Sequence, residues 1–365
     1  MRIVAAMSGG VDSSVTAALL KEQGHEVIGV HMKLHDAPPV SVDGPVSKTC
    51  CGLDDVMDCR RVADALDIPF YVLDMRREFQ KAVMDYFSNN YLRGLTPNPC
   101  IQCNGVLKFR ILLKRAQALG ASHMATGHYA RISDDNILMQ AVDPNKDQSY
   151  FLFPITSEAL SKTLFPLGGM TKPEVRAHGE RLGLVTAKKK ESQDVCFIPD
   201  GKYANFLTGH NKNSLPDGSG EIVTMEGDVV GHHNGFWKYT IGQRRGLGVS
   251  VGKPIYVIDI DPRTKKVVIG DNKFLQSYAL EAVRVNWFRE PKERESLTAR
   301  IRHRGTLIPC TLEGRDPLIV RFHAAARAIT PGQAVVIYSG PEVIAGGWIK
   351  RCIQEQTESN ISITA

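Results

Sequence analysis

Short apolar runs alternate with helix-like segments through the first half of the chain. The runs at 3–7, 27–32, 70–73 and 123–130 are typical of buried strands, whereas 13–23, 54–66 and 105–119 have the spacing of amphipathic helices. Strands separated by helices predict a mostly parallel, doubly wound sheet that is covered by helices on both faces. We therefore expect an α/β fold for this half of the molecule.

The pattern changes near residue 200. Beyond it, glycines recur, β-branched and aromatic residues alternate with polar ones, and long helical periods disappear. The pattern of short strands joined by turns is found at 254–260, 266–269, 309–312, 318–322 and 334–338. We predict an α/β domain over residues 1–199, a central β-rich module over 200–272, a C-terminal β-barrel over 273–354 and a flexible tail at 355–365.

Composition narrows the class of protein. With 365 residues, 43% of them hydrophobic and 23% charged, the chain has the make-up of a globular protein, not of a disordered, collagen-like or coiled-coil one. No apolar run approaches the roughly 20 residues of a membrane span, and the first residues have no secretory pattern. Eight cysteines without an export signal favour a reducing cytoplasm. We expect a cytoplasmic protein with no membrane partner, monomeric by default, whose net charge of +6 permits an RNA partner.

Between the first predicted strand and the first helix lies the segment SGGVDSS, residues 8–14. Its glycines allow a positive φ and a close backbone approach, and the following helix offers open amides and a positive dipole end to a phosphate. Ser8, Ser13 and Ser14 add hydroxyl donors, while Asp12 either caps the helix or helps to hold Mg²⁺. No Gly-Lys pair is followed by Ser or Thr, so this is not a Walker A loop. The alternative is a simple glycine turn capped by Asp12.

Two cysteine segments are the next candidates for chemistry. A C-x-x-C motif at 100–103 follows prolines that stiffen its approach, and Cys103 lies near the start of the helix that carries Lys108, a setting that favours the thiolate. The alternative is half of a zinc site, although no second C-x-x-C or histidine pair has ligand spacing. Cys196 has the apolar neighbours of a core thiol, but the polar residues 191–194 before it favour a loop.

Six motifs in order carry a resemblance to a known family. They are SGGVDS, PNPCxxCN, ATGHYAR, KDQSYFL, SQDVCFIP and YTIGQRRGLG. The first is the signature of the ATP pyrophosphatases, also called the PP-loop family, and all six together resemble the bacterial and organellar tRNA-specific 2-thiouridylases. The resemblance extends from about residue 2 to residue 352.

The resemblance implies an ATP-dependent sulfurtransferase. Such enzymes cleave ATP between its α and β phosphates and adenylate C2 of the wobble uridine. A persulfide then delivers sulfur, which gives 2-thiouridine, AMP and pyrophosphate. The implied cofactors are ATP and Mg²⁺. The implied partners are tRNA, with the Lys, Glu and Gln isoacceptors expected, and a persulfide-donating sulfur carrier or cysteine desulfurase.

The resemblance also implies site residues, position by position. ATP would be bound by Ala6, Met7, Ser8, Gly9, Gly10, Val11, Asp12 and Ser13, with Met32 and Gly127 beside the adenine. The target base would lie against Asn98, Pro99 and Cys100, and tRNA would contact Lys146, Asp147, Gln148, Arg302 and His303. Cys103 would be the nucleophile and Cys196 the persulfide carrier, and these two would form a disulfide during turnover.

The position of Cys100 varies within the family. Other members have an aspartate in this turn, for which a role as general acid or base is proposed. A thiol of ordinary pKa is a poor match for a carboxylate, so this role is in doubt here. An alternative makes Cys100, Cys103 and Cys196 three thiolate ligands of an iron–sulfur cluster.

Basic residues provide a second argument for RNA. From residue 284 to residue 327 there are ten Lys or Arg against five Asp or Glu. Arg300, Arg302 and Arg304 alternate, so on a strand they would line one face and follow a phosphate backbone. A second candidate surface comprises Trp237, Tyr239, Arg244 and Arg245, whose aromatic rings would stack on unpaired bases.

Some features allow more than one interpretation. Cys50, Cys51 and Cys59 lie beside three aspartates, and we favour packing over metal binding. His128 either orients a group near the nucleotide or is a structural histidine. Two rival functions remain at this stage: another PP-loop enzyme that adenylates a small molecule, and a non-catalytic RNA-binding relative.

Overall fold

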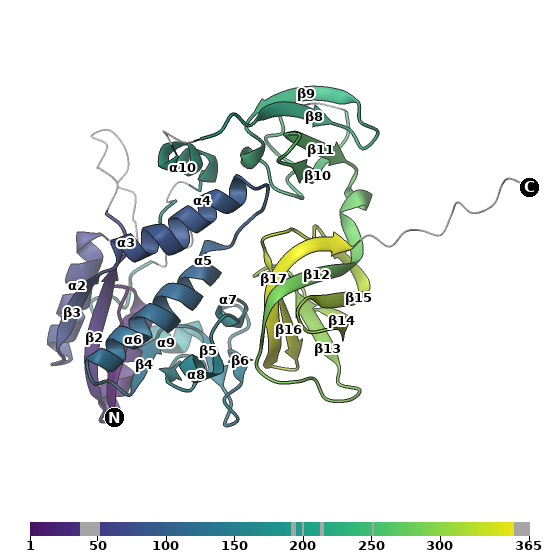
Figure 1. The fold of residues 1–365 in the computed structure, drawn as a ribbon. Helices are drawn as coiled ribbons and strands as arrows, with labels where there is room; N and C mark the ends of the chain where they lie inside the picture. Colours follow the sequence, from purple (N-terminus) through teal and green to yellow (C-terminus); the bar gives the residue numbers. More distant parts are fainter. Residues whose placement is uncertain (37–51, 191–194, 199–200, 212–214, 250–251, 354–365) are drawn as a thin grey trace, which may run out of the picture.

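The computed structural model describes residues 1–36, 52–190, 195–198, 201–211, 215–249 and 252–353. Our predictions for Cys50, Cys51, the polar residues 191–194 and the tail at 355–365 lie outside these residues. The described part contains three sheets (Figure 1), and the C-terminal one also includes two short strands from residues 130–140. None of the helices there has the length and apolar composition to cross a membrane.

The first sheet is parallel and is covered on both faces, as predicted. It contains β1 (Arg2–Ala6), β2 (Glu26–Lys33), β3 (Phe70–Asp74), β4 (His123–Thr126) and β7 (Thr163–Leu164), in the order β3-β2-β1-β4-β7. Side chains alternate along β1, so Ile3 packs with α1 (Val11–Glu22), α2 (Leu53–Ala65) and α9 (Lys172–Arg181). Val4 faces the opposite side and packs with Ile101 and Phe109 of a long helix.

That long helix starts earlier than the predicted residue 105. It runs without a break through α5 (Pro99–Gln102), the π-helical η2 (Cys103–Leu112) and α6 (Leu113–Ala118). The side chain of Asn98 accepts hydrogen bonds from the amides of Cys100 and Ile101, and a proline occupies the first helical position. Both features favour a helix start at this point. The preceding helical stretch of α3 (Arg76–Phe79), η1 (Gln80–Met84) and α4 (Asp85–Tyr91) was not predicted.

The single strand predicted over 123–130 is wrong. β4 ends at Thr126, and the chain turns into a hairpin of β5 (Ala130–Ile132) and β6 (Leu138–Gln140) that belongs to a different sheet. Gly127 makes the turn possible because a Cβ there would lie 2.9 Å from the backbone carbon of Asp12 and from the backbone nitrogen of Ser13. This close approach depends on residues more than a hundred positions away, which local periodicity does not report.

The central module is a four-stranded sheet. Its strands are β8 (Ser219–Val223), β9 (Val229–Asn234), β10 (Tyr256–Asp261) and β11 (Lys266–Gly270), in the order β10-β11-β8-β9. It is preceded by helix α10 (Tyr203–His210), which the change of pattern near residue 200 did not predict. Trp237 and Tyr239 are buried in a core shared with Phe87 and Tyr91 of α4. The prediction that these two aromatic rings stack on RNA bases is therefore wrong, whereas Arg244 and Arg245 are exposed.

The C-terminal region is a closed barrel, as predicted. Its six strands are β12 (Gln276–Trp287), β13 (Leu297–Arg300), β14 (Ile308–Glu313), β15 (Leu318–Arg327), β16 (Ala334–Ser339) and β17 (Glu342–Ile353), and pairing of β12 with β17 closes it. The hairpin of the first domain extends this sheet, since Met139 of β6 pairs with Glu342 of β17. The barrel is thus joined to the N-terminal α/β domain by backbone pairing.

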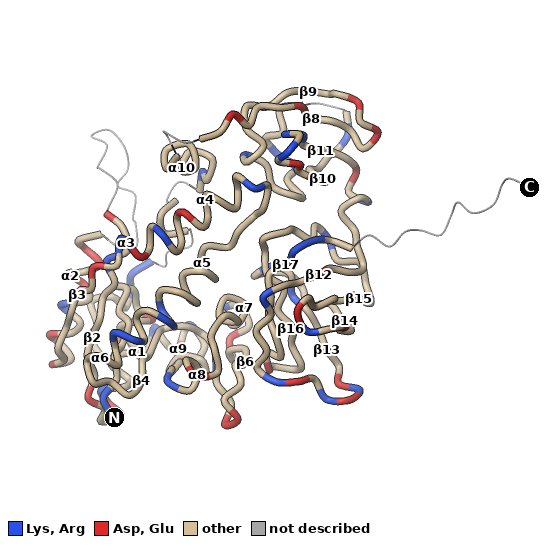
Figure 2. Tube along the Cα trace, viewed as in Figure 1, with Lys and Arg blue, Asp and Glu red and all other residues tan. Residues whose placement is uncertain are grey.

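A buried ion pair strengthens this junction. Arg300 Nη1 lies 3.3 Å from Asp147 Oδ2, and its guanidinium lies over the ring of Tyr338. Strand β13 ends at Arg300 and the chain bends beyond it, so Arg300, Arg302 and Arg304 do not line one strand face. That prediction is wrong because Arg300 points into the junction. Along the barrel, Lys and Arg are interspersed with Asp and Glu (Figure 2).

We expect Asp147→Ala to lower the free energy of unfolding by about 3 kcal/mol, because it leaves Arg300 without its partner in a buried setting. The two side chains are 3% and 15% exposed. Urea denaturation monitored by tryptophan fluorescence measures the loss. As a control, Glu158→Ala breaks the exposed pair with Lys162 and should cost less than about 0.5 kcal/mol. Equal costs for the two variants would contradict the proposed contribution of the junction.

Candidate active site

A cavity of about 280 Å³ opens beside the carboxyl ends of β1 and β2. This is where ligands bind in open parallel sheets, near the point at which the strand order reverses. The cavity is lined by side chains from segments far apart in the chain: Met7, Ser8, His31, Met32, Leu34, Phe79, Val83, Pro99, Cys100, Cys103, Asn104, Lys108, His128, Gln148, Phe151, Val195, Cys196 and Phe197. The phosphate loop, the C-x-x-C motif and the segment around Cys196 therefore meet at one place.

Three thiols line this cavity. Cys103 and Cys196 are partly buried and pack against the same apolar cluster, which includes Phe79, Val83 and Leu107. Cys100 lies one helical turn before Cys103 and is exposed. The fold thus brings together the two cysteines for which the sequence predicts a shared reaction.

The prediction that Cys103 favours the thiolate is wrong for this structure. Burial raises the pKa of the Cys103 thiol to about 11, and the nearby Lys108 only partly opposes this effect. The helix starts at Pro99, so Cys103 lies beyond the first four residues, where the helix dipole acts most strongly. The apolar cluster removes water from the sulfur, which disfavours its charged form. Cys103 is therefore held as a thiol until its surroundings change.

We expect the alkylation rate of Cys103 by iodoacetamide to rise about tenfold per pH unit from pH 7 to pH 10, because only the thiolate reacts. The raised pKa, about 11, means that the thiolate fraction is still increasing throughout this range. Peptide mass spectrometry at several pH values measures the rate. A plateau near pH 8.5 would show an ordinary thiol and contradict the effect of burial.

The phosphate loop has the geometry expected of an anion site. Gly9 has a φ of +78°, and a Cβ at this position would lie 2.8 Å from the carbonyl oxygen of Asp55 in α2. Gly10 caps α1 without a side-chain hydrogen bond, so the first amides of the helix face outward. The hydroxyls of Ser13 and Ser14 donate to the carbonyl oxygen of Gly10 at 3.1 and 2.9 Å. These bonds brace the loop in this structure, and the role of Ser13 and Ser14 as hydroxyl donors to a phosphate stays a prediction.

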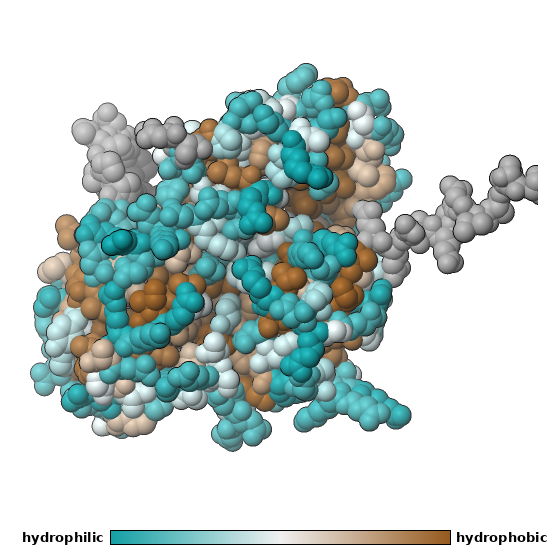
Figure 3. All heavy atoms as spheres, in the orientation of Figure 1, coloured by the Kyte–Doolittle hydropathy of each residue, from teal (hydrophilic) through white to brown (hydrophobic). Residues whose placement is uncertain are grey.

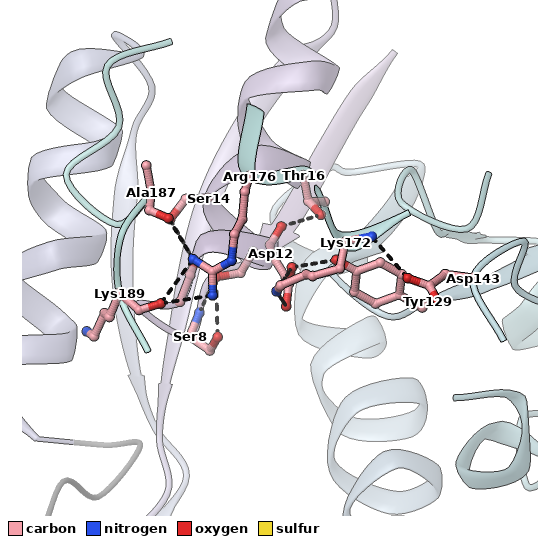
Figure 4. Close-up of polar contacts among 12 residues, drawn as sticks. Ser8, Asp12, Ser14, Thr16, Tyr129, Asp143, Lys172, Arg176, Ala187 and Lys189 are labelled. Atoms are coloured by element: carbon pink, nitrogen blue, oxygen red, sulfur yellow. Dashed lines mark hydrogen bonds and ion pairs between the residues drawn. The ribbon is translucent and has the colours of Figure 1, made fainter. Parts of the chain in front are cut away.

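Asp12 is bound by residues that the sequence analysis did not select (Figure 4). Lys172 Nζ lies 2.6 and 2.8 Å from its two carboxylate oxygens, and the hydroxyl of Tyr129 donates to one of them at 2.8 Å. Lys172 is only 7% exposed. Because Gly10 is the cap, the predicted capping role of Asp12 is wrong. With both oxygens bound, Asp12 does not fit a ligand set for Mg²⁺ as it stands.

A second cation of α9 lies at the same loop. Arg176, four residues after Lys172, donates to the carbonyl oxygen of Ala187 at 2.8 Å. In Figure 4 its guanidinium and the side chain of Ser8 point toward one another. The sequence carried a signal for this helix, since Thr171 and Glu174 form a capping box with a proline between them. Two basic residues spaced four apart share one helix face.

Burial lowers the pKa of two histidines that line the cavity. Burial and the nearby Lys108 hold the pKa of His128 well below its usual range. Lys108 Nζ donates to Nε2 at 3.2 Å, so Nδ1 carries the proton and faces Thr126 Oγ1 at 2.7 Å. His128 is therefore a buried histidine that orients Lys108 at the cavity. This arrangement contains elements of both interpretations from the sequence, a structural histidine and one that orients a neighbouring group. Burial also lowers the pKa of His31, a cavity residue that the sequence analysis missed.

Cys59 belongs to the core under the phosphate loop. Its sulfur lies 3.6 Å from His31 Nδ1, and burial raises the pKa of its thiol to about 12. The thiolate that a metal needs is thus strongly disfavoured. Among the described residues, no group of three His, Cys, Asp or Glu side chains is placed to hold a metal ion.

The predicted contacts with the target base are placed at the cavity, with one exception. Pro99 and Cys100 line it. The side-chain oxygen of Asn98 instead accepts from Cys100 N and Ile101 N at 3.1 and 3.2 Å, so this oxygen serves the helix start. Met32 lines the cavity as well, while Gly127 packs on the backbone at Asp12.

The predicted tRNA contacts divide into two groups. The carboxylate of Asp147 is buried, where it accepts from Ser149 N at 3.1 Å and pairs with Arg300, so its side chain does not face RNA. Gln148 lines the cavity. Arg302 is exposed, and the ring of His303 lies 4.2 Å from that of the cavity residue Phe151. The turn after β13 is therefore next to the cavity.

Family models match nearly the whole chain. The tRNA methyl transferase HUP domain matches residues 1–200, the tRNA methyl transferase PRC-barrel domain matches 205–271, and the aminomethyltransferase beta-barrel domain matches 277–349. The tRNA-specific 2-thiouridylase MnmA of Geotalea uraniireducens (strain Rf4) is 49% identical over 364 residues, which are 98% of this chain and 96% of the relative. The chain belongs to the tRNA-specific 2-thiouridylase family. The family resemblance that the six motifs carry is thus confirmed.

A second relative supports the same family assignment. The protein of the same name from Geobacter metallireducens (strain ATCC 53774 / DSM 7210 / GS-15) is 49% identical over 362 residues, 97% of this chain and 98% of the relative. Among solved structures, a 4-thiouridine synthetase in complex with RNA and ATP aligns with a TM-score of 0.36 and 18% identity, over 58% of this chain and 51% of that one. This structural likeness is too weak to carry an argument, so the family assignment depends on sequence.

Proposed function

We propose that this protein is an ATP-dependent tRNA-uridine 2-sulfurtransferase. It adenylates C2 of the wobble uridine and replaces the oxygen by sulfur from a persulfide, giving 2-thiouridine, AMP and pyrophosphate. The observation that carries the proposal is the meeting of Cys103, Cys196 and the phosphate loop at one cavity. The family relatives, named tRNA-specific 2-thiouridylases, support it.

The phosphate loop serves the first step. The open amides of α1 and the cations of α9 bind the phosphates, while the adenine lies beside Met32. The carbonyl oxygen at C2 attacks the α-phosphorus, and pyrophosphate leaves toward Lys172 and Arg176. Amides and cations held in place before the reaction stabilise the charge that develops on the leaving group. This step turns a poor leaving group, the carbonyl oxygen, into AMP.

The two cysteines serve the second step. A persulfide on Cys196 attacks C2 through its terminal sulfur, and AMP leaves. Cys103 then attacks the inner sulfur of Cys196, so that the sulfur–sulfur bond to the base breaks. The base keeps the terminal sulfur as its thiocarbonyl, and a Cys103–Cys196 disulfide remains. In the alternative order, Cys103 first releases sulfide from the persulfide, and sulfide attacks C2. Burial raises the pKa of Cys103, and Lys108, oriented by His128, opposes part of this rise and so favours the attack in either order.

Mg²⁺, when bound with ATP, would neutralise charge on the phosphates during adenylation. Asp12 is bound by Lys172 and Tyr129, so Mg²⁺ is a prediction tied to the phosphates of ATP and not to a protein cage. Among the described side chains, Cys100, Cys103 and Cys196 are not arranged as a metal-holding group, so they do not fit an iron–sulfur cluster in this structure. A cytoplasmic location, a monomeric state, the Lys, Glu and Gln tRNAs and the sulfur carrier or cysteine desulfurase also stay predictions.

Mass spectrometry of tRNA nucleosides tests the function. Unmodified tRNA is incubated with the protein, ATP, Mg²⁺ and a persulfide source, and 2-thiouridine should appear together with equal amounts of AMP. A PP-loop enzyme that acts on a small molecule would release AMP without 2-thiouridine. A non-catalytic RNA-binding relative would bind tRNA and release no AMP. Either of these results would refute the proposal.

A further inference from the structure

The three thiols of the cavity differ in their access to solvent. Cys100 is exposed, whereas Cys103 and Cys196 are partly buried and pack against the apolar cluster of Phe79, Val83 and Leu107. A disulfide between Cys103 and Cys196 would lie against this cluster. An external reductant would then have to enter the cavity to reach it. Cys100 reaches both the cavity and the solvent.

We propose that Cys100 is a resolving thiol, which opens the Cys103–Cys196 disulfide and transfers it to the C-x-x-C pair Cys100–Cys103. An external dithiol then reduces this second disulfide. The inference rests on the proposed function, because that reaction produces the first disulfide.

The helix start places the two sulfurs of the C-x-x-C pair as neighbours. Cys100 and Cys103 lie three residues apart on the helix that begins at Pro99, and both line the cavity. Residues at this spacing have Cβ atoms about 5–6 Å apart, and a disulfide needs about 4 Å, so the first turn must tighten by about 1–2 Å. A negative charge on Cys100 would raise the pKa of Cys103, as expected for neighbouring sulfurs.

The exchange balances without an oxidant. The Cys100 thiolate attacks the sulfur of Cys103, the Cys103–Cys196 bond breaks, and Cys196 leaves as a thiolate. The Cys100–Cys103 bond replaces the bond that is lost, so no net oxidation occurs. A dithiol reductant later takes up this disulfide and becomes oxidised itself. Cys196 is thereby freed to accept the next persulfide before the reductant acts. An aspartate at position 100 cannot carry out this exchange because it has no sulfur.

Disulfide mapping after one turnover tests the inference. The protein, loaded with persulfide, is mixed with ATP and unmodified tRNA without reductant and is quenched with acid and N-ethylmaleimide. Trypsin cleaves after Arg93, Lys108, Lys190 and Lys202, so Cys100 and Cys103 share the peptide 94–108 and Cys196 lies on 191–202. We expect an internal disulfide in the first peptide and an alkylated Cys196 in the second. A cross-link between the two peptides as the sole product would overturn the inference.

Substitutions at Cys100 test the same role by kinetics. In Cys100→Ser and Cys100→Asp the cross-linked peptides should persist, and the second turnover with a dithiol present should slow at least tenfold relative to the first. Cys352→Ser, which removes a half-buried thiol of the barrel, is the matched control. Its second turnover should be as fast relative to the first as in the wild type. If the second turnover is as fast relative to the first in both Cys100 variants as in the wild type, Cys100 is not a resolving thiol. Iron and sulfide bound through Cys100 after anaerobic purification would also overturn it. If no 2-thiouridine forms in the wild type, the proposed function itself fails, which is a distinct result.

Discussion

A Cys103→Ser variant is expected to form 2-thiouridine at least about 1,000-fold more slowly than the wild type, with ATP binding unchanged. Serine has nearly the same shape, but its hydroxyl does not cleave a sulfur–sulfur bond under these conditions because it is a far weaker nucleophile than a thiolate. Cys103 lines the same cavity as Cys196 and Lys108, in agreement with its proposed attack on the sulfur of Cys196. Nucleoside mass spectrometry measures the product, and calorimetry with ATP measures binding.

Cys196→Ser should show an equal loss, because this variant has no sulfur on which the persulfide forms. Cys310→Ser and Cys352→Ser test the general effect of removing a thiol, since both lie in the barrel, on β14 and β17. These controls should retain activity as far as they remain folded, which circular dichroism reports. If Cys103→Ser or Cys196→Ser keeps the wild-type rate, the assignment of the two cysteines is refuted.

Lys172→Met should weaken ATP binding about 100-fold, equivalent to about 3 kcal/mol, as expected when one partner of a buried charge pair is removed. The lysine bonds both oxygens of Asp12, so its loss leaves a carboxylate uncompensated at the start of α1. That negative charge would repel the β and γ phosphates, which the proposed function places close by. AMP lacks both phosphates and should lose much less affinity. Calorimetric titration with ATP and with AMP measures the difference.

A double variant provides the control. Asp12→Asn combined with Lys172→Met removes both charges, and it should recover part of the ATP affinity if the pair acts as a unit. Lys162→Met removes a partly exposed cation that lies just before the edge strand β7 and pairs with Glu158, and it should change neither affinity. Equal losses for ATP and AMP would indicate a purely structural lysine and contradict its place beside the outer phosphates.

Much of the fold was predictable because its signals are local. Strand and helix periods depend on residues two to four positions apart, and these periods identified the parallel sheet and five of the later strands. The phosphate loop was predictable for the same reason, since the glycines, the helix start and the strand before it lie within a few positions. The error at 123–130 arose where a distant segment, the backbone at Asp12, forces the turn at Gly127.

Burial was the main property that local patterns did not report. Trp237 and Tyr239 look like RNA-stacking residues in sequence, but they fill a core that includes α4. Arg300 looks like one of three aligned arginines, but it pairs with Asp147 across a domain junction. Each case depends on contacts made with residues many positions away. Such contacts decide whether a polar or aromatic side chain meets water or protein.

For the active site, the sequence by itself determined which chemical groups are present and in what order. These are a glycine loop before a helix, a C-x-x-C turn after prolines, and a further cysteine 93 positions later (196 − 103). Covalent identity and neighbours along the chain are enough for that. Only the tertiary structure decided that Lys172 neutralises Asp12, that Cys103 is buried enough to stay a thiol, and that Cys100 alone of the three thiols is exposed. The charge and reactivity of a group depend on its solvent and its partners, and these are set by residues that meet only when the chain folds.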